Sequence, residues 1–255
     1  MVRPVLGLGG ADRSGQTVTI HANGWQAAIG PAGHHLAADG GTFSLGLDLR
    51  PEKPAVMHGD GGYSAKGQAP GEASCYYSFT RLQTPGTLTV AGRRHQVQGS
   101  AWMDHEFSTA PLAAGVTGWD WFSLQFDDRS EVMIYRLRQA DGRVHPASSG
   151  SWVGPSGRVQ SLDKDAVQVQ PLAYWTSPHT GARYPVRWRV AIDALALEIM
   201  VEANLADQEM RTPRSTAVDY WEGSVKAGGT IAGESVAGVG YVELTGYAEP
   251  FAAPM

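Results

Sequence analysis

The stretch Gly118–Phe126 has the sequence GWDWFSLQF. In an extended chain successive side chains point to opposite faces, so alternate residues share a face. One face of this stretch is aromatic and polar, and it consists of Trp119, Trp121, Ser123 and Gln125. The other face is apolar except for one acid, and it consists of Asp120, Phe122, Leu124 and Phe126. Both faces have groups to bury, which predicts a strand inside a β protein.

The acid on the apolar face needs a partner, because an unpaired charge is costly to bury. Asp120 is followed by a second strand-like segment that contains Arg136 and Arg138. We predict that one of these arginines pairs with Asp120 in a structural ion pair.

Similar strand-like segments occur throughout the chain. Short connections such as residues 127–130 and 139–143 contain Asp and Gly and are typical of hairpins. Helical periodicity is limited to short stretches around residues 177–181 and 205–210. The pattern predicts an all-β chain of antiparallel strands. The segments occupy residues 16–21, 42–49, 86–90, 100–107, 131–138, 167–170, 187–192, 195–201, 220–225 and 240–247.

The length of 255 residues suits one large or two modest domains. Roughly eight segments follow residue 98, and a regular meander of that size closes most economically into a barrel, because closure removes exposed strand edges. We predict a C-terminal β-barrel over residues 99–255, with an interior wide enough for one ligand. Residues 1–98 are predicted to form a partial β domain with fewer strands.

Composition and motifs exclude several functional classes. The net charge of -5, with 18% charged residues, lacks the basic footprint of a nucleic-acid-binding protein. Cys75 is the single cysteine, so neither an internal disulfide nor a cysteine-rich zinc site is expected. Residues 1–10 lack the apolar stretch of an export signal, and no apolar stretch approaches the ~20 residues of a spanning helix. The motifs of serine hydrolases, kinases, zincins and dinucleotide-binding proteins are absent.

The candidate catalytic residues are Asp104, His105 and Glu106. On a strand, Asp104 and Glu106 share a face and His105 points the other way, so the three cannot bind one metal ion. If the shared face lines the barrel interior, burial and like-charge proximity would raise the pKa of one carboxyl and keep it protonated near neutrality, as a general acid requires. The alternative is a solvated face with His105 as a structural partner.

Aromatic residues lie close to this carboxylate pair in the sequence and on later strands. Indole faces attract positive charge, so a tryptophan pair beside a carboxylate suits a cationic intermediate. A lumen of Tyr, Trp and a few carboxylates suits a long, mainly apolar ligand with one reacting end. The alternative is that the tryptophans form the core and rim of the barrel. The candidate substrate-binding residues are Trp102, Trp119, Trp121, Tyr77, Tyr220, Glu222 and Tyr241.

Motifs spread over most of the chain resemble one known family. They comprise residues 58–59, 62–67, 74–78, 99–107, 118–123, 184–185, 207–209, 220–223 and 240–247. The chain resembles the lipocalin-like family that includes hydroxyneurosporene synthase, also called carotenoid 1,2-hydratase, and AttH-like bacterial proteins. The resemblance is closer to the AttH-like branch.

This resemblance implies two lipocalin-like β-barrel domains side by side. Relatives usually begin with a signal sequence and are often exported to the periplasm, and they carry a Trp-Trp-Tyr strand and a Gln-Val-Thr-Phe-Phe strand near the N-terminus. The chain has neither the signal sequence nor these two strands, so we expect the N-terminal barrel to be truncated or incomplete.

The resemblance also implies chemistry on unactivated alkenes, namely hydration of an acyclic carotenoid or, in fungal relatives, cycloaddition of a polyene. We expect a cofactor-independent hydratase of an apolar isoprenoid alkene, with Asp104 as the acid and Glu106 or His105 as the group that orients water. A carrier of an apolar ligand and a pericyclase are the alternatives. The expected partner is an apolar small molecule, and peripheral contact with a membrane is one route of access for it.

Overall fold

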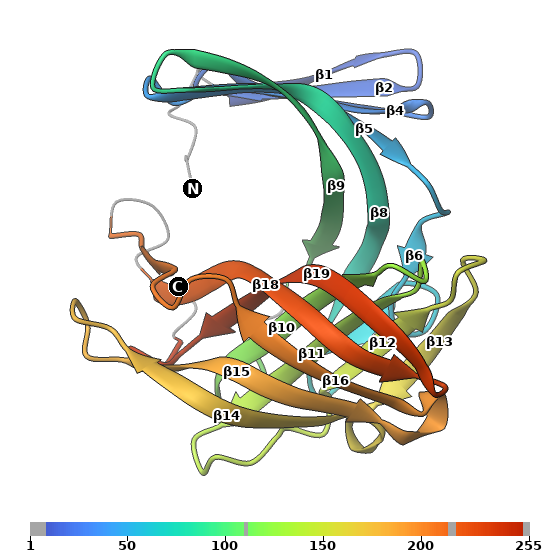
Figure 1. The fold of residues 1–255 in the computed structure, drawn as a ribbon, viewed down its shortest axis with the longest axis vertical. Coiled ribbons are helices and arrows are strands. Elements are labelled where there is room, and N and C mark those ends of the chain that lie inside the picture. Colours follow the sequence, from blue (N-terminus) through green and yellow to red (C-terminus); the bar gives the residue numbers. More distant parts are fainter. Residues whose placement is uncertain (1–8, 110–111, 214–217, 252–255) are drawn as a thin grey trace. The chain divides into compact units, whose positions relative to one another are not determined.

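The computed structural model describes residues 9–109, 112–213 and 218–251, which form two antiparallel β-sheets (Figure 1). The only helical elements in these ranges are two 3-10 turns, Lys164–Ala166 and Asp193–Leu195. The all-β prediction is confirmed. No helix of the described residues is long and apolar enough to cross a membrane.

The short helices expected around residues 177–181 and 205–210 do not form. The first of these stretches is a turn that one serine closes: the hydroxyl of Ser177 accepts the backbone N–H groups of His179 (3.0 Å) and Thr180 (3.2 Å). Serine side chains offer the backbone this local alternative to helical hydrogen bonds.

The first sheet has the strand order β1-β2-β3-β4-β5-β8-β6, with β7 and β9 also paired to β8. It has more strands than the sequence predicted before residue 98, and tight turns explain the difference. Asn23 and Gly24 both have positive φ, as a two-residue hairpin between β2 and β3 requires. The strands are β1 Gly9–Ser14, β2 Thr17–Ala22, β3 Trp25–Gly30, β4 Gly33–Asp39, β5 Phe43–Pro51, β6 Val56–Met57, β7 Tyr63–Ala65, β8 Ala73–Val90 and β9 Arg93–Phe107.

The second sheet has the order β13-β12-β11-β10-β19-β18-β16-β15-β14, with β17 paired to β18. The strands are β10 Val116–Phe126, β11 Glu131–Gln139, β12 Ser149–Val153, β13 Val159–Asp163, β14 Gln168–Thr176, β15 Arg183–Ile192, β16 Leu197–Ala203, β17 Glu209–Arg211, β18 Asp219–Ile231 and β19 Glu234–Thr245.

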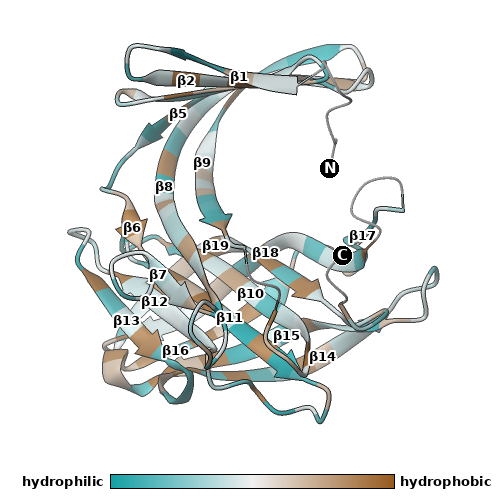
Figure 2. Ribbon diagram, turned by 180° about the vertical axis from the view of Figure 1, so that it is seen from behind, coloured by the Kyte–Doolittle hydropathy of each residue, from teal (hydrophilic) through white to brown (hydrophobic). Residues whose placement is uncertain are grey.

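The second sheet curls around a core of large apolar side chains. Phe122 of β10 meets Trp188 of β15 edge-to-face with ring centroids 5.5 Å apart, and Trp188 meets Trp221 of β18 at 6.5 Å. Apolar and polar residues alternate along these strands (Figure 2). These side chains belong to one cluster of buried apolar residues contributed by strands across the second sheet.

The chain divides into two compact units, each made of two segments. The first unit contains Met1–Ala55 and Phe79–Met103, and the second contains Val56–Ser78 and Asp104–Met255. Strands β8 and β9 each run through both units, and the predicted boundary between residues 98 and 99 lies inside β9. The second unit therefore combines the second sheet with β6, β7, the start of β8 and the end of β9.

The predicted ion pair of Asp120 is confirmed. Its side chain is 4% exposed, and Oδ1 accepts hydrogen bonds from Arg138 Nε and the Tyr247 hydroxyl, both at 2.9 Å. Arg136 lies farther away, with 3.8 Å between its guanidinium and Oδ2. The Arg138 guanidinium also covers the ring of Tyr247 at 3.8 Å. This buried cluster fixes the C-terminal end of β19 against β10.

We expect Asp120→Ala to destabilise the protein by about 3 kcal/mol, because it leaves Arg138 without its buried partner. The measurement is chemical denaturation at neutral pH. Asp141→Ala is the matched control, since Asp141 pairs with Arg143 at 2.6 Å on the surface; it should change stability little. Equal effects of the two substitutions would contradict the structural role of Asp120.

Candidate functional site

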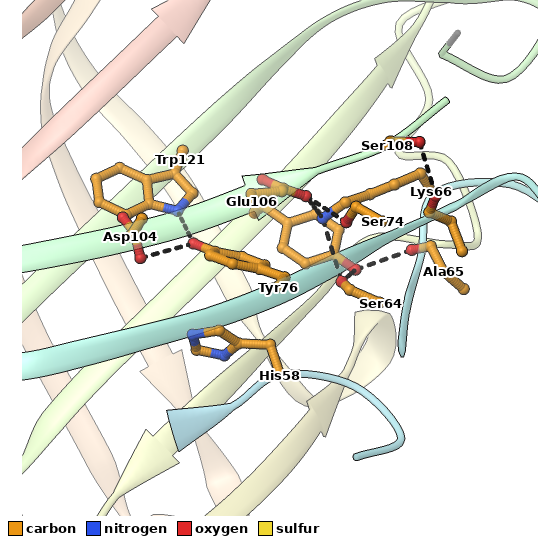
Figure 3. A network of polar contacts seen from close by, with 12 residues as sticks. His58, Ser64, Ala65, Lys66, Ser74, Tyr76, Asp104, Glu106, Ser108 and Trp121 are labelled. Atoms are coloured by element: carbon orange, nitrogen blue, oxygen red, sulfur yellow. Dashed lines mark hydrogen bonds and ion pairs between the residues drawn. The ribbon is translucent and has the colours of Figure 1, made fainter. Parts of the chain in front are cut away.

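The candidate site lies on the face of β10 that points away from the core. Trp119 and Trp121 occupy this face because they alternate with the core residues Asp120 and Phe122. The indole N–H of Trp121 donates to the Tyr76 hydroxyl at 3.1 Å. Polar side chains from the start of β8 and the end of β9 therefore meet the outer face of the second sheet (Figure 3).

Asp104 is surrounded by hydroxyl donors. The Tyr76 hydroxyl donates to Oδ1 of Asp104 at 3.1 Å, and the Ser78 hydroxyl donates to the same oxygen. Tyr76 and Ser78 share one face of β8 by strand alternation. Hydrogen bonds to a carboxylate favour its charged form, so these contacts suit Asp104 as an anion.

His58 lies behind this carboxylate and is 1% exposed. Its Nε2 is 2.7 Å from Ser78 Oγ, and its Nδ1 is 2.9 Å from Ser151 Oγ. Burial, together with the positive charge of Lys66, lowers the pKa of His58 to about 3. The imidazole is therefore neutral at physiological pH.

Glu106 has a different environment from Asp104, although the two share a face of β9. Its Oε1 is 2.9 Å from the Lys66 ammonium and accepts the Ser74 hydroxyl at 2.5 Å. Lys66 also lies 3.7 Å from the ring centroid of Tyr135. Glu106 thus belongs to an ion pair and is not, with Asp104, one of two carboxyls sharing a proton.

Glu243 of β19 is the carboxyl whose surroundings favour the protonated form. It lies between Trp121 and Glu222 in the sheet, as the cross-strand partner of both. Its Oε1 accepts hydrogen bonds from Trp119 Nε1 and Thr245 Oγ1, each at 3.2 Å. Burial, with the negative charges of Glu222 and then Asp104, raises the pKa of Glu243 to about 7.

Sequence reasoning did not select Glu243 as a candidate. Alternation in residues 240–247 places Glu243 on one face with Tyr241, but the sequence does not show which strand lies beside β19. To identify Glu243, one must know the strand register that places it opposite Glu222. Like charges that face each other across strands are unfavourable unless one is neutral.

Aromatic groups border this acid. Tyr220 of β18 and Tyr241 of β19 are half-buried and exposed, respectively, and burial together with the Glu222 charge raises the pKa of both phenols. Trp119 also packs edge-on against Phe251, with ring centroids 4.8 Å apart. The structure therefore brings together Trp119, Trp121, Tyr220, Glu222 and Tyr241 from the predicted set.

Three residues predicted from the sequence lie outside this group: His105, Tyr77 and Trp102. His105 points to the opposite face of β9 from Asp104, where it stacks on Tyr77 with ring centroids 5.2 Å apart. Trp102 is half-buried and belongs to the part of β9 in the first unit.

Among the described residues, no group of three or more His, Cys, Asp or Glu side chains is arranged to hold a metal ion.

Comparisons with known proteins place the chain in a family. A family model described as AttH-like matches residues 1–247. The crystal structure of a putative AttH protein from Nitrosomonas europaea has a TM-score of 0.83 and 33% identity, covering 92% of this chain and 72% of that one. No protein of curated function matches the sequence.

A more distant structure shares the fold. Kievitone hydratase from Nectria haematococca has a TM-score of 0.70 and 18% identity, with 86% of this chain and 65% of that chain covered. The chain thus spans slightly less than two thirds of the length of that protein. The family match over nearly the whole sequence and the 33% identity to the Nitrosomonas protein lead to one assignment: the chain is a member of the AttH-like family.

Proposed function

We propose that the protein is a hydratase of an apolar, isoprenoid-type alkene, and that Glu243 and Asp104 carry its two proton transfers. One observation carries the proposal: the two carboxyls have opposite environments. Glu243 is the cross-strand neighbour of Trp121, and the Trp121 indole bonds to the Tyr76 hydroxyl, which donates to Asp104. Burial and negative neighbours favour the neutral acid at Glu243, whereas hydroxyl donors favour the anion at Asp104. Two carboxyls whose environments differ in this way divide into an acid and a base.

Hydration begins with the acid. The Glu243 carboxyl donates its proton to the less substituted alkene carbon, and the electron pair of the double bond forms the new C–H bond. The other carbon becomes a tertiary cation. A pKa of about 7 suits this step, because a general acid works best when its pKa is near the operating pH.

The aromatic groups then stabilise the positive charge. The faces of Trp119 and Trp121, with the neighbouring Tyr220 and Tyr241, provide the electron-rich surface that attracts a cation. The Glu243 carboxylate formed in the first step, together with Glu222, adds negative charge on the same side. The site is therefore complementary to the charge that develops during the reaction.

Water completes the addition. Asp104 accepts a proton from the water molecule as its oxygen bonds to the cation, which yields a tertiary alcohol. Glu243 has then lost one proton and Asp104 has gained one, and exchange with solvent restores both. The contacts support Asp104 as this base in place of the acid role expected from the sequence. The two carboxyls suffice for both transfers without a cofactor.

Similarity to known proteins adds support. The fold is shared with a protein that is named a hydratase, and the sequence motifs resemble the family that includes carotenoid 1,2-hydratase, although they are closer to its AttH-like branch.

We expect Glu243→Gln and Asp104→Asn each to lower hydration at least about 100-fold, because each removes one proton transfer. The probe is farnesol, an acyclic isoprenoid alkene, incubated in ¹⁸O-labelled water, with mass spectrometry to detect the added water. Glu198→Gln is the matched control, since Glu198 is an exposed carboxylate on β16 that pairs with Arg189 of β15; it should keep wild-type activity.

Two outcomes would contradict the proposal. Hydration that survives in Glu243→Gln would remove the acid from the mechanism. Conversion of a polyene probe to a cyclised product by wild type and Glu243→Gln alike would instead indicate a pericyclase, which needs no acid.

The pKa of Glu243 predicts a pH dependence with a definite sign. The acid acts in its protonated form, which is present below about pH 7 and lost as pH rises through that value. We therefore expect kcat/KM to fall about tenfold per pH unit on the alkaline side. ¹³C NMR of the Glu243 carboxyl measures the same titration without substrate.

Glu222→Gln should shift this titration to lower pH, because it removes the negative charge that raises the pKa of Glu243 most. Glu234→Gln, an exposed substitution at the start of β19, should leave it unchanged. A titration midpoint that stays in place in Glu222→Gln would show that the two carboxyls are not coupled.

A further inference from the structure

A row of polar groups leads from Asp104 through Ser78 and His58 to Ser151 within the second unit. The Ser78 hydroxyl contacts Asp104, His58 contacts Ser78, and the far side of the imidazole contacts Ser151. The exposed fractions of His58, Ser78 and Ser151 are 1%, 0% and 2%. Groups buried to this degree must satisfy their hydrogen bonds from one another.

The number of hydrogens fixes the direction of each bond. A serine hydroxyl has one hydrogen, and that of Ser78 is donated to Asp104. Ser78 must then accept from His58, so the imidazole hydrogen is on Nε2. A neutral imidazole has one N–H, which leaves Nδ1 to accept the hydroxyl hydrogen of Ser151.

The opposite tautomer would change the contacts of Asp104. With the hydrogen on Nδ1, the bare Nε2 would lie 2.7 Å from Ser78 and would compete for its hydroxyl hydrogen. Asp104 would lose a donor that favours its anionic form. The tautomer of His58 is therefore coupled, through the Ser78 hydroxyl, to the charge state of Asp104.

We propose that His58 is a positioning residue for Asp104: as the neutral Nε2–H tautomer it donates to Ser78, turns the single Ser78 hydrogen towards Asp104, and holds that carboxyl ready to act as a base. The inference rests on the proposed function for the role of Asp104. The groups that face His58 are the Tyr76 ring, at 4.3 Å between centroids, the two serines and the charge of Lys66.

The tautomer is measured by ¹⁵N NMR of histidine-labelled protein. His58 is identified as the signal lost in His58→Gln. In the wild type we expect a protonated Nε2 and an unprotonated Nδ1. His145 serves as an internal reference for folding, because its Nδ1 accepts the backbone N–H of Ala147 at 3.2 Å and has no part in the row. A wild-type His58 with its hydrogen on Nδ1 overturns the proposal.

Two substitutions on one face of β9 test the coupling. Asp104→Ala removes the acceptor of the Ser78 hydrogen, so we expect that hydrogen to turn to Nε2 and the His58 signals to shift towards the Nδ1–H tautomer. Glu106→Ala is the matched control, because Glu106 pairs with Lys66 and leaves the row intact. An unchanged signal in Asp104→Ala, or an equal change in both variants, overturns the coupling.

An activity measurement separates positioning from packing. Glutamine can place an N–H donor near the position of Nε2, whereas leucine cannot, so we expect His58→Leu to lower kcat about tenfold with little change in KM, and His58→Gln to retain most of the rate. Equal losses in both variants would indicate packing alone. If no hydration is found in the wild type, the proposed function fails while the NMR result still decides the role of His58.

Discussion

The structure of the second unit depends on the burial of both faces of β10. One face carries Phe122 and Leu124 into the core, where Phe122 meets Trp188. The other face carries Trp119 and Trp121, which contact polar groups instead. Because successive side chains alternate, each site residue of β10 is next in sequence to a core residue. The packing of the core therefore also fixes the position of the candidate site.

The chemistry of the site follows from how unequally its acids are surrounded. Asp104 faces hydroxyl donors, Glu106 faces an ammonium, and Glu243 faces other carboxylates in a half-buried position. Three carboxyls in one unit therefore have three different roles available to them. Burial is the largest cause of the raised pKa of Glu243, and the charge of Glu222 on the neighbouring strand adds to it.

Much of the fold was predictable because strand alternation is a local property. The segment 118–126 predicted a two-faced strand, and the partner of Asp120 followed from the need to neutralise a buried charge. Room for a ligand inside the barrel is not a local property, because alternation does not show how the inward side chains meet across the interior. Glu243 was missed for a related reason, since its pKa depends on Glu222 in a neighbouring strand.

The sequence by itself determined the all-β class, the two faces of β10 and the family resemblance, since these depend on residue order within single segments. Only the tertiary structure decided that Glu106 pairs with Lys66, that Asp104 is connected through Ser78 to His58, and that Glu243 lies opposite Glu222. These contacts join residues far apart in the chain. Their energies depend on distance and burial, which arise only when the strands assemble.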